Sequence, residues 1–406
     1  MLRRMLAYTQ KLVDIPLLMN RLRDAREQPR ISTATVARGV LVMMLSRLGS
    51  FNALAQTRNS PFWNKWLGGK MPSADTMGRV VQGISDLEPL RVGMAQVYAR
   101  LKRMKAMPAP GHGLMLAVLD GHETHATYRQ CCPGCLRRKI KTGHGEKVEY
   151  YHRLVNMVLV GEGFCFELDV EMILPGEDEV AAALRLYDRV LKAYPRAFDV
   201  VAGDGLYARG NFFNHIKSSG KDVIAVLKDE QRILLQDAQA LFGEMAPAIH
   251  QRGQVRCEYW DIEGFTTWPQ CQYPVRVVRS RETRSIKRQL NKKLDTQETN
   301  WVWVTTLSHS RASTKAVVRL GHDRWTIENQ SFNELVNRWH GDHIYRHDPQ
   351  AILFLWLMLQ LAVNVFAAFY RRNLKSAVRK ACDTLEIARR ILSSLYQPLP
   401  QSRPPP

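Results

Sequence analysis

The sequence has few cysteines and few acidic residues relative to basic ones, and it does not open with a long apolar run. Seven cysteines in 406 residues are too sparse, and odd in number, for a secreted scaffold held together by disulfides. The first residues, MLRRML, are basic, but no apolar stretch of signal-peptide length follows them. We therefore expect a globular protein that is not exported.

The deficit of acidic residues gives the chain a strong positive charge. Lysine and arginine number 58 against 38 aspartates and glutamates, a formal net charge of +20. Such a protein is expected to bind a polyanion, either nucleic acid or an anionic membrane face, more readily than an acidic protein. The 45% apolar content and nine tryptophans exclude disorder over the whole chain, and the length favours two or three domains.

One apolar run, Ala351–Tyr370, has about the length that spans a bilayer. The alternative is a helix that is apolar all round because it lies inside a large domain. Gln360 and Asn364 share one face of this segment, and we see no second segment of its kind. These features favour a core helix, so we expect no membrane partner.

Residues 1–107 are predicted to be helical, with apolar residues at helical spacing in Thr35–Leu48 and Thr76–Ile84. Basic residues are spread through this region, which favours a helical DNA-binding domain. A helical cap with a solvated basic surface is the alternative. Met107–Gly111, with two prolines and a glycine, is predicted to be a linker.

Short apolar runs bounded by turns follow, and residues 112–229 are predicted to form a mixed five-stranded α/β sheet flanked by helices. The expected strands are Leu114–Leu119, Tyr150–Val160, Phe164–Ile173, Phe198–Ala202 and Asp222–Leu227. Residues 230–315 are predicted to be a β-rich insertion, with a basic segment at 279–293 between its strands. Residues 316–395 are predicted to be helical, and the proline-rich residues 396–406 to be a flexible tail.

Three acidic residues are the strongest functional signal. Asp120 and Asp204 each follow a predicted strand, and strand ends present reactive groups at the edge of an α/β sheet. Glu328 shares a helix face with apolar residues, so we expect it to point into the protein. Carboxylates that lie near one another in a basic protein are suited to Mg²⁺ and to two-metal phosphoryl transfer. Ordinary Asp-Gly turns, and an ion pair between Glu328 and Arg324, are the alternatives.

These acids and their surroundings resemble the DDE transposases of bacterial insertion sequences. The similar segments are LMLAVLD ending at Asp120, VVAGDGLYARGNFF around Asp204 and DRWTIENQSFNEL around Glu328. The resemblance covers roughly residues 110–370 and implies an RNase-H-like core with a β-rich insertion before the glutamate. It also implies that Asp120, Asp204 and Glu328 are catalytic and bind Mg²⁺ or Mn²⁺ during DNA cleavage and strand transfer.

The resemblance further implies the partners and setting of the protein. We expect double-stranded DNA, as terminal inverted repeats and target, a homodimer on DNA, and a cytoplasmic, nucleoid-associated location in a bacterium. A metal-dependent DNA nuclease without strand transfer and a catalytically inactive DNA-binding derivative remain alternatives.

The signature around the catalytic glutamate of this family, Tyr-x2-Arg-x3-Glu-x6-Lys, is only partly present. Arg324 and Glu328 match it, whereas Gly321 and Leu335 stand where the tyrosine and lysine would be. Arg324 is therefore interpreted as a DNA phosphate ligand or as an ion-pair partner of Glu328. Arg338, one helical turn beyond Leu335, is proposed to replace the missing lysine.

Two further motifs lie between the first two predicted strands. Cys132 and Cys135 form a CxxC motif, which two of His122, His125 and His144 would complete as a structural zinc site. Reduced structural thiols or a catalytic thiol are the alternatives. Arg137, Arg138 and Lys139 follow in a predicted loop, where they would contact DNA phosphates or form an ordinary solvated charge run.

Overall fold

The computed structural model describes residues 1–27, 29–107, 113–124, 126–143, 145–161, 164–228, 232–287 and 294–396. Four of the features predicted above fall wholly or partly outside these ranges. They are the linker after Met107, His125 and His144 among the proposed zinc ligands, residues 288–293 of the basic segment, and the tail after Tyr396.

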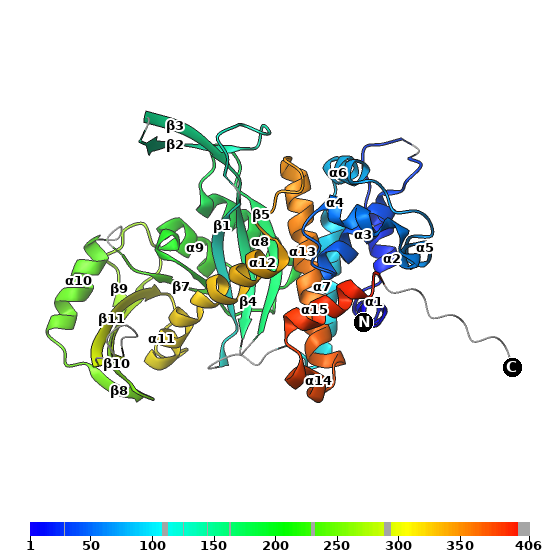
Figure 1. The fold of residues 1–406 in the computed structure, drawn as a ribbon. Coiled ribbons are helices and arrows are strands. Elements are labelled where there is room, and N and C mark those ends of the chain that lie inside the picture. Colours follow the sequence, from blue (N-terminus) through cyan, green and yellow to red (C-terminus); the bar gives the residue numbers. More distant parts are fainter. Residues whose placement is uncertain are drawn as a thin grey trace.

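The N-terminal region is helical, as predicted. Its helices are α1 (Leu2–Leu12), α2 (Ile15–Arg21), α3 (Thr33–Leu45), α4 (Phe51–Gln56), α5 (Pro61–Leu67), α6 (Ala74–Gly83) and α7 (Glu88–Arg103). Serines start several of them: Ser32, Ser50 and Ser73 accept hydrogen bonds from backbone N–H groups in the first turns of α3, α4 and α6. In Figure 1 these helices lie together on one side of α13.

The central sheet contains the five predicted strands in the spatial order β5-β4-β1-β6-β7. They are β1 (Leu116–Glu123), β4 (Arg153–Gly161), β5 (Phe164–Met172), β6 (Val200–Gly203) and β7 (Asp222–Val226). The first three pair antiparallel, while β1 with β6 and β6 with β7 pair parallel. Helices α8 (Glu179–Ala193) and α9 (Gly210–Ser218) connect β5 to β6 and β6 to β7. This is the RNase-H-like arrangement that was expected.

The β-rich insertion extends this sheet. After α10 (Arg232–Gly243) come β8 (Ala248–Arg252), β9 (Val255–Phe265), β10 (Val275–Lys287) and β11 (Leu294–Thr305). Because β11 pairs antiparallel with β7, all nine strands form one sheet in the described part of the chain. The basic segment was expected between strands, but residues 279–287 belong to β10 itself.

A separate two-stranded hairpin projects from the sheet between β1 and β4, at the top of Figure 1. Its strands are β2 (Leu136–Thr142) and β3 (Gly145–Tyr151), and we call it the β-arm. The prediction that Arg137, Arg138 and Lys139 lie in a loop was wrong. The sequence of β2 is mostly polar and exposed, so it lacks the apolar alternation that marks a half-buried strand.

The C-terminal region is helical. It comprises α11 (Thr314–Asp323), the π-helical turn η5 (Ile327–Phe332), α12 (Asn333–Trp339), α13 (Pro349–Ala368), the π-helical turn η6 (Phe369–Asn373), α14 (Ser376–Ala381) and α15 (Thr384–Ser393). Helix α15 lies beside α1, and the amino group of Met1 donates a hydrogen bond to Ser394 Oγ over 2.9 Å.

Helix α13 is the core of the molecule, between the sheet and the N-terminal helices (Figure 1). Pro349–Asn373 is the one helical segment in the described ranges long and apolar enough to cross a membrane, and 89% of its apolar window is buried inside the protein. The two polar residues in the run have internal partners: Asn364 bonds the backbone of Glu167, and Gln360 lies 3.5 Å from the Glu167 carboxylate. These contacts support the core-helix interpretation.

Candidate active site at the edge of the sheet

Asp120 and Asp204 lie on neighbouring strands. Strand β1 continues to Glu123, so Asp120 is within the strand rather than at its end, where it pairs with Asn156 of β4. Asp204 directly follows β6, the parallel neighbour of β1. Its carboxylate accepts a hydrogen bond of 2.8 Å from the Leu206 backbone N–H, which orients the side chain at the start of a short 3₁₀ turn.

Glu328 lies in the π-helical turn η5, which contacts β1, β4 and β5. One wide turn of this kind adds a residue to the helix, and such turns are frequent at functional sites. Arg324 Nη1 lies 2.9 Å from Glu328 Oε1 and 3.6 Å from Asp120 Oδ2, so one guanidinium nitrogen joins the two acids. The side chain of Arg324 is buried and lies over the Trp325 ring.

The carboxylates of this site repel one another. Burial raises the pKa of Asp120 to about 7; Asp204, Glu328 and Glu179 add to the rise, and Arg324 opposes it. A buried carboxylate stays ionised only where enough positive charge faces it, and here the positive charge of Arg324 does not offset burial. The site is therefore short of positive charge, and its oxygen donors suit a hard divalent cation.

Glu179 is a fourth acid at this site, and nothing in its local sequence marks it. It begins α8, and its side chain reaches β1 so closely that a Cβ on Gly121 would lie 2.2 Å from its Oε2. Tyr207 donates a hydrogen bond of 2.9 Å to Glu179 Oε1, and Arg153 Nη2 lies 2.8 Å from Oε2. These two partners hold a buried carboxylate directly behind Asp120.

An open groove of about 770 Å³ lies beside this site, and of the four acids only Glu179 is among its described lining residues. Glu179 and Leu206 line one end, and Arg137, Tyr151 and Arg153 line the side formed by the β-arm and β4. The groove thus brings basic side chains of the β-arm toward the acidic edge of the sheet.

The other basic residues singled out by the sequence have different surroundings. Arg138 binds Glu123 and Glu149 over 2.6–2.8 Å, and Lys139 lies 3.7 Å from Glu146. Among the described residues, no carboxylate lies within ion-pair distance of Arg137. Arg338 is exposed near the end of α12 and bonds Thr384 of α15, so it is not brought together with the acids.

Packing explains why the glutamate signature is incomplete. A Cβ on Gly321 would lie 2.4 Å from the indole of Trp303, so Trp303 fills the space where the tyrosine side chain would begin. Trp303 is buried and stacks on Trp301, as expected for a core pair on one strand face. Leu335 is buried in the hydrophobic core, where a lysine would have to bury its charge.

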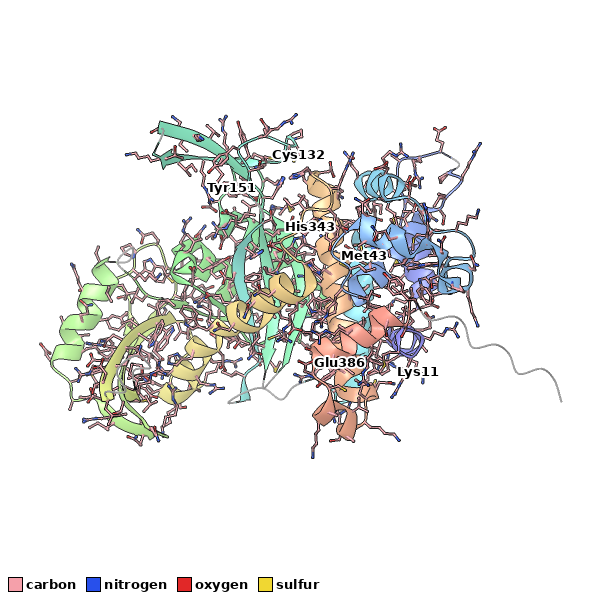
Figure 2. The ribbon with its side chains drawn as sticks, in the orientation of Figure 1. Lys11, Met43, Cys132, Tyr151, His343 and Glu386 are labelled. Carbon is pink, nitrogen blue, oxygen red and sulfur yellow. The ribbon has the colours of Figure 1, made fainter. Side chains whose placement is uncertain are left out.

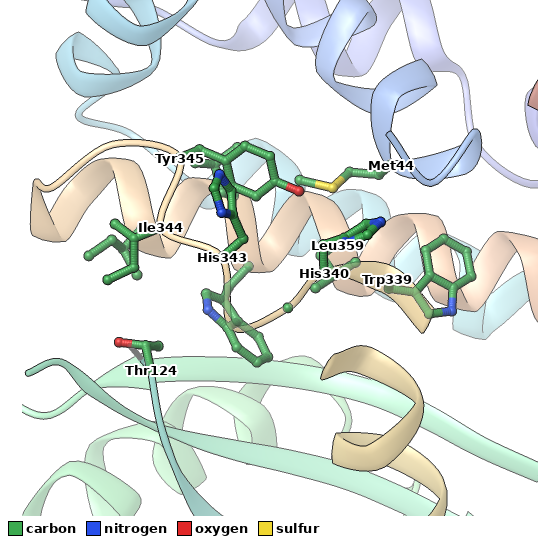
Figure 3. A pocket seen from close by; sticks show the side chains of 12 residues that line it. Met44, Thr124, Trp339, His340, His343, Ile344, Tyr345 and Leu359 are labelled. Carbon is green, nitrogen blue, oxygen red and sulfur yellow. The ribbon is translucent and has the colours of Figure 1, made fainter. Parts of the chain in front are cut away.

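The histidines that follow α12 lie away from the acids. Figure 3 shows His340 and His343 around a small cavity, of about 20 Å³, beside α13 and Met44 of α3. His340 ends α12 in the left-handed conformation, at φ 57°, and its Nε2 lies 3.2 Å from the carbonyl of Arg47. These residues therefore join α12 to the N-terminal helices.

The CxxC motif is brought together with a histidine that was not predicted. The Sγ atoms of Cys132 and Cys135 lie 3.3 and 3.6 Å from His152 Nε2. His122, one of the expected zinc ligands, instead packs against Phe332 and Trp356. His152 lies 17 residues beyond Cys135, after the whole β-arm, so spacing alone could not identify it.

A sheet in the order β5-β4-β1-β6-β7, with one acid on β1, one directly after its parallel neighbour β6 and one on a packed helical turn, defines an RNase-H-like class of protein. A comparison with protein families agrees with this class. The family model described as the transposase DDE domain matches residues 120–365, so the chain belongs to this transposase family. A search of curated proteins found no match.

Proposed function

We propose that this transposase binds the ends of its element, cleaves the DNA with Mg²⁺ or Mn²⁺, and joins the freed 3′-hydroxyl to a target. The observation that carries the proposal is the meeting of Asp120, Asp204 and Glu328 at one edge of the sheet, inside the residues that the family model matches. Family membership itself supports DNA as the substrate and a cytoplasmic DNA-acting protein.

Asp120, Asp204 and Glu328 would hold the divalent ions through carboxylate oxygens. When bound, such ions lower the pKa of an attacking water or hydroxyl and stabilise the leaving oxygen of an in-line displacement. Arg324 supplies positive charge between Asp120 and Glu328 and so reduces their repulsion. Glu179, held by Tyr207 and Arg153, adds negative charge behind Asp120.

The basic residues would hold the DNA against this acidic centre. Arg137 faces the groove, and Arg138 and Lys139 lie on the same exposed strand, where phosphates would compete with their glutamate partners. Arg338 would contact DNA farther along, at the end of α12. We propose that residues 1–107 and the basic part of the insertion bind the terminal inverted repeats, in a homodimer that pairs the two ends.

Two alternative functions are compatible with the same fold. A nuclease would use the acids to hydrolyse DNA without joining the product, and an inactive derivative would bind DNA only. The presence of all three acids, with a shortage of positive charge around Asp120, favours a metal-using enzyme over the inactive derivative.

The test is strand cleavage and joining on DNA that carries the sequences flanking the reading frame. We expect Asp204→Asn to lower cleavage in Mg²⁺ by roughly a thousandfold, because about 4 kcal/mol of metal-assisted stabilisation would be lost. DNA binding should persist, and Asp188→Asn, an exposed aspartate on α8, should retain cleavage. Full activity of Asp204→Asn would refute the proposal, and cleavage by the wild type without joined product would indicate the nuclease.

A further inference from the structure

A second group of ligand-type side chains lies outside the acidic site, at the base of the β-arm. Cys132, Cys135 and His152 are all buried, with at most 9% of each residue exposed. In the described ranges of the chain, they are the one group of three such residues whose ligand atoms all lie within 4.8 Å of one another. Figure 2 shows Cys132 and Tyr151, the neighbour of His152, where the β-arm joins the body of the protein.

The distances between the three atoms match the edges of a zinc tetrahedron. Zn–S bonds of about 2.3 Å and Zn–N bonds of about 2.0 Å at tetrahedral angles put two sulfurs about 3.8 Å apart, and a sulfur and a nitrogen about 3.5 Å apart. The observed separations are 3.6 Å for the two Sγ atoms and 3.3 and 3.6 Å from them to His152 Nε2. The sulfurs are too far apart for a disulfide, whose S–S bond is about 2.05 Å.

The backbone around the cluster has the form of a metal-binding knuckle. The Cys135 N–H donates to the Cys132 carbonyl, which closes a tight turn around Pro133 and Gly134. His152 is fixed from the other side, because its carbonyl accepts hydrogen bonds from both the N–H and the hydroxyl of Thr124. The ligands are thus held by two rigid segments and not by one mobile loop.

A third segment closes the remaining side of the cluster. A Cβ on Gly134 would lie 2.3 Å from Cγ of Pro349, so the knuckle packs on the first residue of α13. Asp348 caps α13 through the Ala351 N–H, so the start of this helix is fixed beside the knuckle.

We propose that Cys132, Cys135 and His152 bind a Zn²⁺ ion. This site is structural and separate from the acids. It ties the segment directly before β2 to the residue between β3 and β4, and so fixes the direction of the β-arm. The proposal does not rest on the proposed function, because zinc would be bound whether or not the protein cleaves DNA.

The first test is the zinc content of the full chain purified without chelator. We expect one zinc per chain in the wild type and a loss of nearly all of it in Cys132→Ser and Cys135→Ser. Cys131→Ser is the matched control, because Cys131 is adjacent in sequence but exposed, and it should keep its zinc. Asp204→Asn should also keep zinc, which separates this site from the acids. A zinc-free wild type, or a Cys132→Ser protein with full zinc, would overturn the proposal.

A second measurement uses the wild type alone, in case the cysteine variants fail to fold. Zinc is removed with a chelator and replaced by Co²⁺, whose visible and near-ultraviolet absorption reports tetrahedral geometry and thiolate ligands. We expect a tetrahedral spectrum with thiolate charge-transfer bands, and an octahedral spectrum without them would contradict the site.

Discussion

At the level of single residues, Glu167 links the core to the turn that holds Glu328. Its carboxylate accepts a hydrogen bond of 2.6 Å from Ser331, three residues after Glu328, and it lies beside Gln360 of α13. Burial raises the pKa of Glu167 to about 7, with Glu334 adding to the rise and the two hydrogen bonds opposing it. The group therefore keeps its proton in the folded protein under conditions in which the unfolded chain releases it.

We predict that Glu167 makes the protein less stable as the pH rises from about 4.5 to about 7. In that window the folded state binds a proton that the unfolded state has lost, so the free energy of unfolding falls, by up to about 3 kcal/mol above neutral pH. Denaturant unfolding of wild type and Glu167→Gln at pH 5 and pH 8 measures this. The free energy of unfolding of Glu167→Gln, relative to that of wild type, should be higher at pH 8 than at pH 5. The same difference between the two proteins at both pH values would contradict the assignment.

Some of the residues at the two sites could be predicted from their positions in the sequence, and others could not. The three acids were singled out because two follow apolar runs in the sequence and the third lies on an amphipathic helical segment. Glu179 and His152 were missed because each is brought in by tertiary packing, Glu179 at the start of α8 and His152 across the β-arm. Nothing in the local sequence of either residue signals these contacts.

At the level of elements, the close contact between α11 and β11 sets the position of the helical segment that carries Arg324 and Glu328. Gly321 allows α11 to lie directly on Trp303. The departure from the family signature at Gly321 was visible in the sequence, but its cause, the packing against Trp303, was not. The strands of the insertion were also predicted from the sequence, but their attachment to the central sheet was not. That attachment depends on the pairing of β11 with β7 in the folded protein.

We predict that Gly321→Ala destabilises the protein by about 1–3 kcal/mol, because the added methyl group overlaps the Trp303 indole. This loss exceeds the gain of about 1 kcal/mol or less that alanine normally brings to a helix. Thermal unfolding measures the effect. Gly69→Ala is the control, since a Cβ there meets nothing within 4 Å. Trp303→Phe should partly rescue Gly321→Ala, and an unaltered melting temperature in Gly321→Ala would refute the packing argument.

At the level of the whole molecule, a chain with a net charge of +20 holds a group of mutually repelling acids. Arg137 of the β-arm places positive charge in the groove, and β10 of the extended sheet carries further basic residues. The sequence predicted the five-stranded core and its order of helices and strands, because apolar runs bounded by turns mark them. It did not predict the β-arm, whose residues are polar on both faces.

We predict that Arg137→Ala weakens DNA binding and lowers the slope of log affinity against log salt by about one, as expected for the loss of one phosphate contact. Arg389→Ala removes the same charge from an exposed site on α15 and should leave the slope nearly unchanged. Titrations of labelled DNA at several salt concentrations measure both. Equal slopes for wild type and Arg137→Ala would remove Arg137 from the DNA interface.

The central claim is that Asp120, Asp204 and Glu328 hold the catalytic metal directly, and a change of metal preference tests it. Each acid is replaced in turn by cysteine, whose thiolate binds Mg²⁺ poorly and Mn²⁺ better. DNA cleavage by each variant is then measured in either ion, with Asp188→Cys as the control. The account predicts that cleavage by all three variants is lost in Mg²⁺ and partly restored in Mn²⁺, while the control is active in both. Undiminished cleavage in Mg²⁺, or no recovery in Mn²⁺, would contradict it.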